Sequence, residues 1–531
     1  MTLMRISRGG AFVAAVIAGA LVLTGCTPAD TAAPDTVKDT LVLGKSFDLA
    51  TADPARSFET TGGIFGRAVY DTLLTFAKGD ATTPIPMVAE SYEVNEGATE
   101  YTFALRDDVV FSDGTPLTSA DVVFSFDRVK NIQGNGSFLM EGLSVTAPDE
   151  STVVITSEKP NTAIPAIITA QTLGIVNSEV VKANGGTDAE DASTTDTAEE
   201  FLNTTSAGSG PYIIETFNTE TETVIVANPN YWGEPAAYEK IVLKNATAEN
   251  QLMDVQSGTI DIALDLGSDQ LPAIESNPDL VIESGISPTI FFLFSNANPE
   301  ISEITSTQAF RDAVKYGLDY DGLLEIAGDG SEQVAGVVPS VFFGALKPAD
   351  VTVRDLDKAK AAVAELGDID PIELEYPSDF SVAGISFGAV AERIQANLKE
   401  VGLEITLAPS PISTALDSYR GGTEEMGLWL WNPDYPDPAD YLVFAPDNIV
   451  GLRAGWTGGS HPELVELSDQ AAITTDEAER EAIFREYQLA MNEVGVFAPL
   501  FQPAASVVAG KDIEGAVFSA VFGIDLTYIG K

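Results

Sequence analysis

The chain has 531 residues, of which 45% are hydrophobic and 8% aromatic, and its 80 acidic and 28 basic residues give a formal net charge of −52. This hydrophobic content excludes a disordered polyelectrolyte, and the length allows several buried cores, so we expect at least two lobes. The charge repels nucleic acid and anionic membrane surfaces, so no nucleic-acid partner is expected.

The N-terminal segment has the three parts of a secretory signal. Arg5 and Arg8 form a short basic region, residues 11–23 are an uninterrupted run of apolar or small residues, and small residues precede Cys26. The run is shorter than the roughly 20 residues that a membrane-spanning helix needs. Small residues followed directly by cysteine resemble a bacterial lipobox, which implies a signal peptide over residues 1–25 and an acylated Cys26. The alternative is a secreted protein with an incidental thiol.

Cys26 is the only cysteine of the chain. Once it is acylated, no thiol remains for a disulfide or a thiolate metal site. Acyl chains anchor a protein to a membrane, so we expect the protein on the extracytoplasmic face of the cell membrane. Residues 26–39 are rich in Thr, Ala, Pro and Asp and predict a lipid-anchored flexible tether.

Strand and helix patterns alternate after the tether and predict α/β lobes. Residues 40–43 are a short apolar strand, and residues 101–105 alternate with period two. Residues 118–121 (TSAD) form a capping box that opens a helix with a buried side at Val122, Val123, Phe126 and Val129. Residues 183–200 are rich in Gly, Thr, Asp and Ala and predict a solvated surface loop.

A second strand–helix–strand pattern lies in the later half of the chain. Residues 372–376 predict a strand, and apolar residues at helical spacing from Ala391 to Val401 predict a helix that Gly402 stops. Residues 403–407 predict the next strand.

Five blocks, in order along the chain, resemble the large extracytoplasmic solute-binding proteins, family 5, of peptide and nickel ABC importers. The blocks are residues 112–126 (SDGTPLTSADVVFSF), 208–212 with 228–233 (GSGPY and NPNYWG), 255–261 (VQSGTID), 309–319 (AFRDAVKYGLD) and 394–403 (IQANLKEVGL). Ser119 is a departure from the family's pattern in the first block. The resemblance extends across residues 41–531.

The resemblance implies a two-lobed α/β clamp like the periplasmic binding proteins, with an extra subdomain in lobe I and a two-strand hinge. Lobe I would comprise residues 40–290 plus 500–531, with the subdomain at about 77–207, and lobe II residues 291–499. The implied function is that of a monomeric receptor, without a cofactor and without enzymatic turnover, that captures a short peptide and delivers it to the transmembrane subunits of an ABC permease.

The segment from Trp429 to Tyr441 (WLWNPDYPDPADY) is the richest candidate binding cluster. Its three prolines forbid a continuous helix, so its side chains are expected on a rigid irregular segment. It resembles the family segment in which a tryptophan is followed three residues later by an aspartate that binds the peptide's α-amino group. The matching residues are Trp431 and Asp434, and Trp429 is a further candidate; an Asx-type turn at Asp434 is the structural alternative. Thr60 and Thr61, in the polar loop 57–63, are candidate contacts from lobe I.

Three other functions remain open from the residues. Gly384-Ile385-Ser386-Phe387-Gly388 fits the nucleophile-elbow pattern of serine hydrolases, and the only histidine, His461, lies downstream. Nickel carriers share the fold, but one histidine and no free cysteine offer few nitrogen or sulfur ligands. An oligosaccharide is the third alternative, with Trp429, Trp431 and Trp456 available for stacking. The spacing of Asp434, Asp437 and Asp440 lacks the glycine and the glutamate of a calcium loop.

Overall fold

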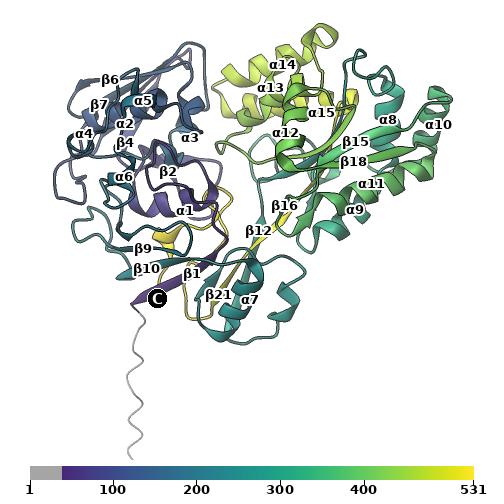
Figure 1. The fold of residues 1–531 in the computed structure, drawn as a ribbon. Helices are drawn as coiled ribbons and strands as arrows, with labels where there is room; N and C mark the ends of the chain where they lie inside the picture. The colour runs from purple at the N-terminus through teal and green to yellow at the C-terminus, as the bar shows by residue number, and fades with distance from the viewer. Residues whose placement is uncertain (1–38) are drawn as a thin grey trace, which may run out of the picture. The chain divides into compact units, whose positions relative to one another are not determined.

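Two large mixed β-sheets organise residues 39–531, the part of the chain that the computed structural model describes (Figure 1). The predicted signal peptide, Cys26 and the tether up to residue 38 lie outside the described residues. No helix within residues 39–531 combines the length and apolar character that a bilayer span requires.

The first large sheet has seven strands, in which β1 pairs in parallel with both β10 and β11. Helices α1 (Thr60–Val69) and α7 (Ala248–Ser257) pack against it. Its strands in spatial order are β12 (Leu280–Ile286), β21 (Ala504–Gly510), β11 (Ile262–Ala263), β1 (Thr40–Lys45), β10 (Lys240–Asn245), β9 (Glu222–Ala227) and β8 (Tyr212–Thr216).

The second large sheet has six strands, and helices cover it on both faces. All six residues of β13 are buried, with Phe291 and Leu293 in one core and Ile290, Phe292 and Phe294 in the other, as expected for a central strand. In spatial order the strands are β14 (Glu332–Gln333), β20 (Phe497–Gln502), β13 (Ile290–Ser295), β19 (Met426–Trp431), β15 (Ile372–Pro377) and β18 (Ile405–Ser410). The helices of this region are α8 (Gln308–Gly317), α9 (Tyr320–Ala327), α10 (Leu356–Leu366), α11 (Phe387–Val401), α12 (Ile412–Gly421), α13 (Ile449–Arg453), α14 (Pro462–Ile473) and α15 (Glu477–Val494).

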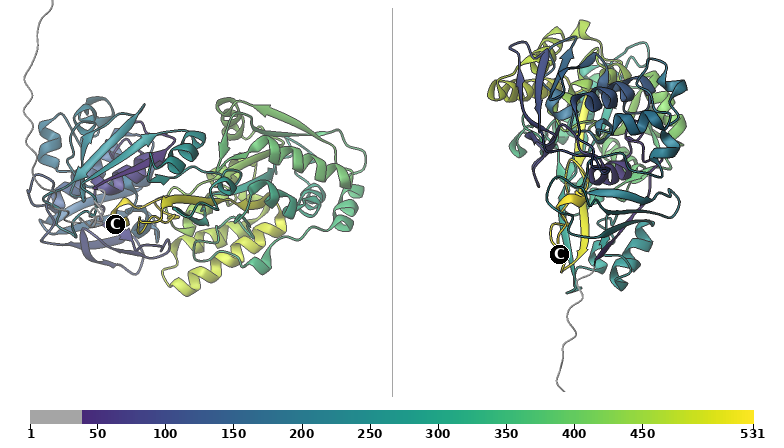
Figure 2. Two further views of the ribbon diagram at one scale, coloured as in Figure 1. Left: turned by 90° about the horizontal axis from the view of Figure 1, so that it is seen from below. Right: turned by 90° about the vertical axis from the view of Figure 1, so that its left-hand side faces the viewer.

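The chain passes between the two large sheets twice. Residues 287–289 lead from β12 of the first sheet to β13 of the second, and Pro503 leads from β20 back to β21. Figure 2 shows the yellow C-terminal segment reaching both the purple and blue elements and the green ones. Two short connections therefore join the sheets.

A smaller antiparallel sheet occupies residues 89–157 and carries its own core. Its order is β4 (Ala89–Val94), β5 (Glu100–Leu105), β7 (Thr152–Ser157) and β6 (Leu143–Asp149), and α2 (Ser119–Ile132) packs on it. The remaining elements are β2 (Leu74–Phe76), β3 (Pro84–Pro86), β16 (Ser381–Val382), β17 (Ile385–Ser386), α3 (Ile164–Ile167), α4 (Ser178–Ala183), α5 (Ala192–Thr195) and α6 (Glu199–Leu202).

Most of the predicted elements are confirmed. The strand at residues 40–43 is the start of β1, residues 101–105 lie in β5 with Tyr101 and Phe103 buried, and residues 372–376 lie in β15. The capping box opens α2, where the Asp121 carboxylate accepts the Thr118 backbone N–H at 2.9 Å. Helix α11 ends at Gly402, whose φ of 94° is the left-handed conformation that glycine adopts most easily.

The prediction of a solvated loop over residues 183–200 is wrong in part. Short helices α5 and α6 lie there, and the side chain of Asp196 is fully buried against Arg128 of α2, with N–O distances of 2.8 and 3.0 Å. The same guanidinium donates to both oxygens of Asp53 at 2.6 Å. One buried arginine therefore joins three segments that are remote in sequence, which is why composition alone misjudges this stretch.

Replacing Arg128 with methionine leaves Asp53 and Asp196 with Arg56 as their remaining cation, 2.5 and 3.0 Å away. We therefore expect a loss of about 3 kcal/mol in the free energy of unfolding, the lower end of the range for a broken buried ion pair. The matched control is Arg106→Met, because Arg106 is 38% exposed and forms its pair with Asp108 at 2.7 Å; a surface pair of this kind contributes less than about 1 kcal/mol. Urea denaturation followed by circular dichroism measures both, and equal midpoints for the two variants would contradict the prediction.

Candidate ligand-binding cavity

A cavity of about 820 Å³ is lined by residues connected to both large sheets. From the first sheet come Lys45 at the end of β1 and the start of α1, and from the second come residues 432–436 after β19 and residues 380–384 of the β16–β17 hairpin. The connecting residues 287–289 and residues 504–507 of β21 also line it. The volume is in the range of pockets that enclose small organic ligands.

Asp434 lines this cavity from the irregular segment that follows β19. Its side chain is half-buried, and its carboxylate accepts no hydrogen bond and forms no ion pair with any residue that the structure describes. Burial raises the pKa of Asp434 to about 6, against the opposing effect of the positive charge of Arg453. A half-buried carboxylate without a partner, in the wall of a cavity, is suited to bind a cationic group.

Asp440 holds the backbone of Asp434 through a hydrogen bond. It is 2% exposed and lies in the 3₁₀ helix η5 (Pro438–Phe444), and its Oδ2 accepts the Trp431 indole N–H at 2.8 Å and the Asp434 backbone N–H at 3.3 Å. Burial raises the pKa of Asp440 well above its usual value, and the charge of Asp434 raises it further. Burial therefore disfavours the charged form more strongly at Asp440 than at Asp434, although the hydrogen bonds from Trp431 and Asp434 oppose it.

Asp437 is committed to a buried ion pair. Both of its oxygens accept from the Arg480 guanidinium, at 2.6 and 3.0 Å, and Oδ1 also accepts the Ala439 backbone N–H at 2.8 Å. The three aspartates of the segment thus have different roles. Within residues 39–531, no group of three or more His, Cys, Asp or Glu side chains is arranged to hold a metal ion.

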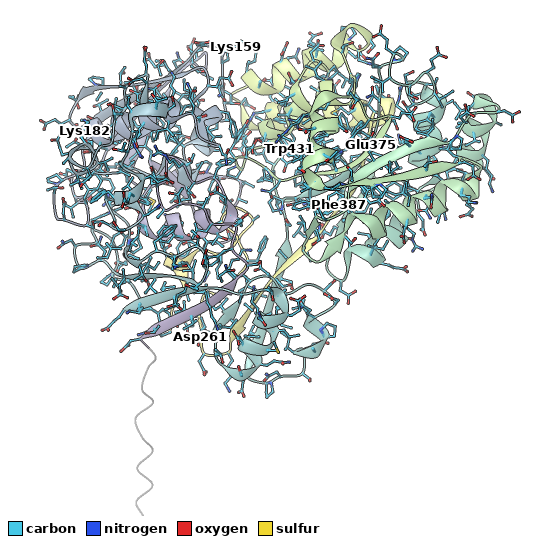
Figure 3. The ribbon with its side chains drawn as sticks, in the orientation of Figure 1. Lys159, Lys182, Asp261, Glu375, Phe387 and Trp431 are labelled. Carbon is cyan, nitrogen blue, oxygen red and sulfur yellow. The ribbon has the colours of Figure 1, made fainter. Side chains whose placement is uncertain are left out.

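The two tryptophans of the predicted cluster lie in β19 and not on the irregular segment. Trp429 is 4% exposed, stacks on Tyr419 with centroids 4.4 Å apart, and donates its indole N–H to Glu424 at 2.9 Å. Burial raises the pKa of the Glu424 carboxyl to about 9, so this acid is neutral at pH 7. Trp431 is half-buried against Phe444, close to the boundary between the green and blue elements in Figure 3. Neither tryptophan is among the residues that line the cavity.

The predicted polar loop 57–63 contains the beginning of α1, which starts at Thr60. Thr60 is exposed and lines the cavity, whereas Thr61 is fully buried and does not. The Asp48 carboxylate accepts the backbone N–H groups of Thr60 and Thr61 at 3.1 and 2.9 Å. The free N–H groups that open a helix are an anion-binding site, and here Asp48 occupies it.

Two polar side chains of the cavity wall, Gln171 and Lys45, could not be predicted from local sequence patterns. Gln171 lines the cavity close to α1, and both polar atoms of its side chain are buried without a hydrogen-bond partner. Lys45 lines the cavity with its ammonium 2.5 Å from Asp265. An unsatisfied buried amide costs free energy unless a ligand supplies the missing bonds, so Gln171 is a candidate contact that sequence reasoning missed.

Ser386 and His461 are not arranged as a catalytic pair. Ser386 ends the β16–β17 hairpin and precedes α11, whereas His461 lies before α14 and its Nδ1 is 3.0 Å from the Trp456 indole nitrogen and 2.9 Å from the Ser460 hydroxyl. A base must reach the proton of its nucleophile. The His461 ring instead forms its hydrogen bonds with Trp456 and Ser460, which are close to it in the sequence.

Comparisons with known proteins agree with this architecture. A structure of HbpA2 from Haemophilus parasuis superposes with a TM-score of 0.80 at 22% identity, covering 92% of this chain and 99% of that one. DppA from Helicobacter pylori, solved in complex with the peptide STSA, superposes with a TM-score of 0.74 at 21% identity and covers 92% of this chain and 98% of that one. These likenesses confirm the expected fold, a two-lobed α/β clamp of the periplasmic-binding-protein type.

The sequence comparisons identify the family. The probable D,D-dipeptide-binding periplasmic protein DdpA of Escherichia coli (strain K12) is 27% identical over 491 residues, which cover 91% of this chain and 92% of that protein. The model of the bacterial extracellular solute-binding proteins, family 5, matches residues 83–447. The chain belongs to the bacterial extracellular solute-binding proteins of family 5.

Proposed function

We propose that the chain is the substrate-binding lipoprotein of an ABC importer, which captures short peptides between two lobes and delivers them to the permease without chemical turnover. The observation that carries the proposal is the unpaired carboxylate of Asp434 in the wall of a cavity of about 820 Å³. Peptide ligands are supported by relatives whose own names specify them, a D,D-dipeptide-binding protein and a peptide-bound DppA.

The proposed contacts follow from the cavity wall. Asp434 would hold the α-ammonium group of the peptide in a charge-assisted bond, and the Gln171 amide would donate to and accept from a peptide group. Thr60 offers a hydroxyl from the start of α1. For Trp431 we propose a positioning role, because its indole N–H is engaged by Asp440; Trp429 and Thr61 would support the site from buried positions.

The proposed lobes are residues 40–290 with 500–531 and residues 291–499. Support comes from the sheets, since within the described part the chain passes between them only at residues 287–289 and at Pro503, close to the proposed boundaries. The end of β20, residues 500–502, pairs in the six-stranded sheet. Two short connections permit hinge closure on a ligand. Closure of the lobes would then enclose the ligand in the cavity, which residues from both sheets line.

Replacing Asp434 with asparagine should weaken binding of a free-amine tripeptide by about 10- to 100-fold, because a hydrogen bond to a charged group contributes about 1.5–3 kcal/mol. N-acetylation of the peptide should weaken binding to the unmodified protein equally and change nothing further in the variant. Titration calorimetry measures both. Asp469→Asn, which removes an exposed carboxylate outside the cavity, is the matched control. Unchanged affinity in the Asp434 variant would rule out the amine clamp.

The affinity for free-amine peptides should also depend on pH. Burial raises the pKa of Asp434 to about 6, and only the ionised carboxylate binds an ammonium group strongly, so affinity should rise with pH up to about 7. It should fall again above about pH 8, where the α-ammonium group of the peptide loses its proton. We expect about a tenfold weaker affinity at pH 5 than at pH 7.5, since a pKa of 6 leaves about one tenth of the groups ionised at pH 5. The N-acetylated peptide is the control and should show a flat profile; a flat profile for the free amine would contradict the assignment.

The lipid anchor makes a separate prediction. Cys26→Ala removes the proposed acylation site. In the native host the variant should move from the membrane fraction to the soluble extracytoplasmic fraction, with ligand affinity unchanged. Fractionation followed by immunoblotting measures the distribution; a variant that stays with the membrane would show that Cys26 is not the anchor.

A further inference from the structure

The charges that line the cavity specify the ligand further. Its described wall carries the carboxylates of Asp48, Glu59, Asp265 and Asp434 and a single ammonium group, that of Lys45. The formal balance is three negative charges. Closing a cavity around a charge removes water from it, so this imbalance acts on the ligand with less screening than the same charges on an open surface.

The single cation is already engaged. The Lys45 ammonium lies 2.5 Å from Asp265, and the two side chains are 15% and 21% exposed. The other oxygen of Asp265 accepts the Ser46 backbone N–H at 2.6 Å and the Gln251 amide at 2.8 Å. Lys45 therefore neutralises a carboxylate of the wall and is not free to pair with a second one.

The neighbouring arginines, Arg453 and Arg67, do not add a positive charge to the cavity wall. Arg453 lies over the Tyr419 ring, 4.8 Å from its centroid, and Arg67 forms an ion pair with Asp525 at 3.2 Å; neither is among the residues that line the cavity. Two helices start in this wall. Asp48 accepts the N–H groups of Thr60 and Thr61 at the start of α1, whereas the start of α7, at Thr247 and Ala248, has no side-chain cap. A ligand carboxylate thus finds no free lysine or arginine in the described wall, and the end of α7 offers only about half a positive charge against a balance of three negative charges.

We propose that the cavity selects short peptides with a net positive charge, and that the terminal carboxylate of the peptide gives no binding energy. The inference rests on the proposed function, peptide capture, and adds the charge class of the peptide. Apolar residues of the wall such as Leu264, Phe380 and Val382 would pack along the methylene stem of a basic side chain, while Asp48 and Glu59 attract its charged end.

A set of six tripeptides tests the proposal. Lys-Ala-Ala, Ala-Ala-Ala and Glu-Ala-Ala are each prepared with a free carboxylate and with a C-terminal amide, all with a free N-terminal amine, and titrated at pH 7.5 by calorimetry. We expect Lys-Ala-Ala to bind at least tenfold more tightly than Glu-Ala-Ala, and each amide to bind at least as tightly as its acid.

The variant Lys45→Gln shows whether Lys45 pairs with Asp265 or with the terminal carboxylate of the peptide. If Lys45 serves Asp265, the variant binds Lys-Ala-Ala as tightly as the unmodified protein or more tightly, whether acid or amide. If Lys45 held the peptide carboxylate, the variant would lose at least tenfold for the acids and nothing for the amides. Lys240→Gln is the matched control, because Lys240 forms an ion pair with Glu215 at 2.6 Å outside the cavity.

The outcomes separate this inference from the proposed function. A tenfold loss on amidation, tighter binding of the glutamate peptide, or equal binding of all six peptides would overturn the charge selection and leave peptide capture standing. Failure of every peptide to bind would overturn both.

Discussion

The conformation of the binding segment depends on two hydrogen bonds that the buried carboxyl group of Asp440 accepts. This carboxyl group anchors the Trp431 indole and the Asp434 backbone N–H, so it fixes the chain where β19 gives way to an irregular path. Burial and the nearby Asp434 both raise the pKa of Asp440, so the charged form is disfavoured more strongly there than at Asp434. Asp434 lines the cavity, and its carboxylate has no hydrogen-bond or ion-pair partner among the described residues. The amine clamp that we propose needs both properties, a fixed position and an unpaired charge.

The same segment is attached to a connection between the sheets. The Tyr441 hydroxyl donates to the Pro288 carbonyl at 3.0 Å, and the Thr289 hydroxyl donates to the Asn432 side chain at 2.8 Å. Pro288 and Thr289 belong to the passage from β12 to β13. Rotation about this passage would therefore carry Asp434 with the six-stranded sheet and change its distance from α1, which couples hinge closure to formation of the site.

Local sequence signals predicted individual helices and strands well, because caps, periodicity and glycine stops act within a few residues, as at Asp121 and Gly402. The two-lobed arrangement was implied by the family resemblance. The proline-rich path around Asp434 was also predicted from local signals, whereas Trp429 and Trp431 lie in a strand whose register depends on β13, more than a hundred residues away. Gln171 and the Lys45–Asp265 pair were missed because tertiary contacts alone give them a role. Asp196 was missed because the low-complexity composition around it hides one buried carboxylate.

A crystal structure of the protein with bound Lys-Ala-Ala would test the amine clamp directly. We expect the peptide inside the cavity, with its α-ammonium nitrogen about 2.7–2.9 Å from an Asp434 oxygen, as in charge-assisted hydrogen bonds. We also expect no lysine or arginine side chain in contact with the peptide carboxylate. A peptide bound in the reverse direction, or an Asp434 carboxylate that remains unpaired beside a bound peptide, would contradict the central claim.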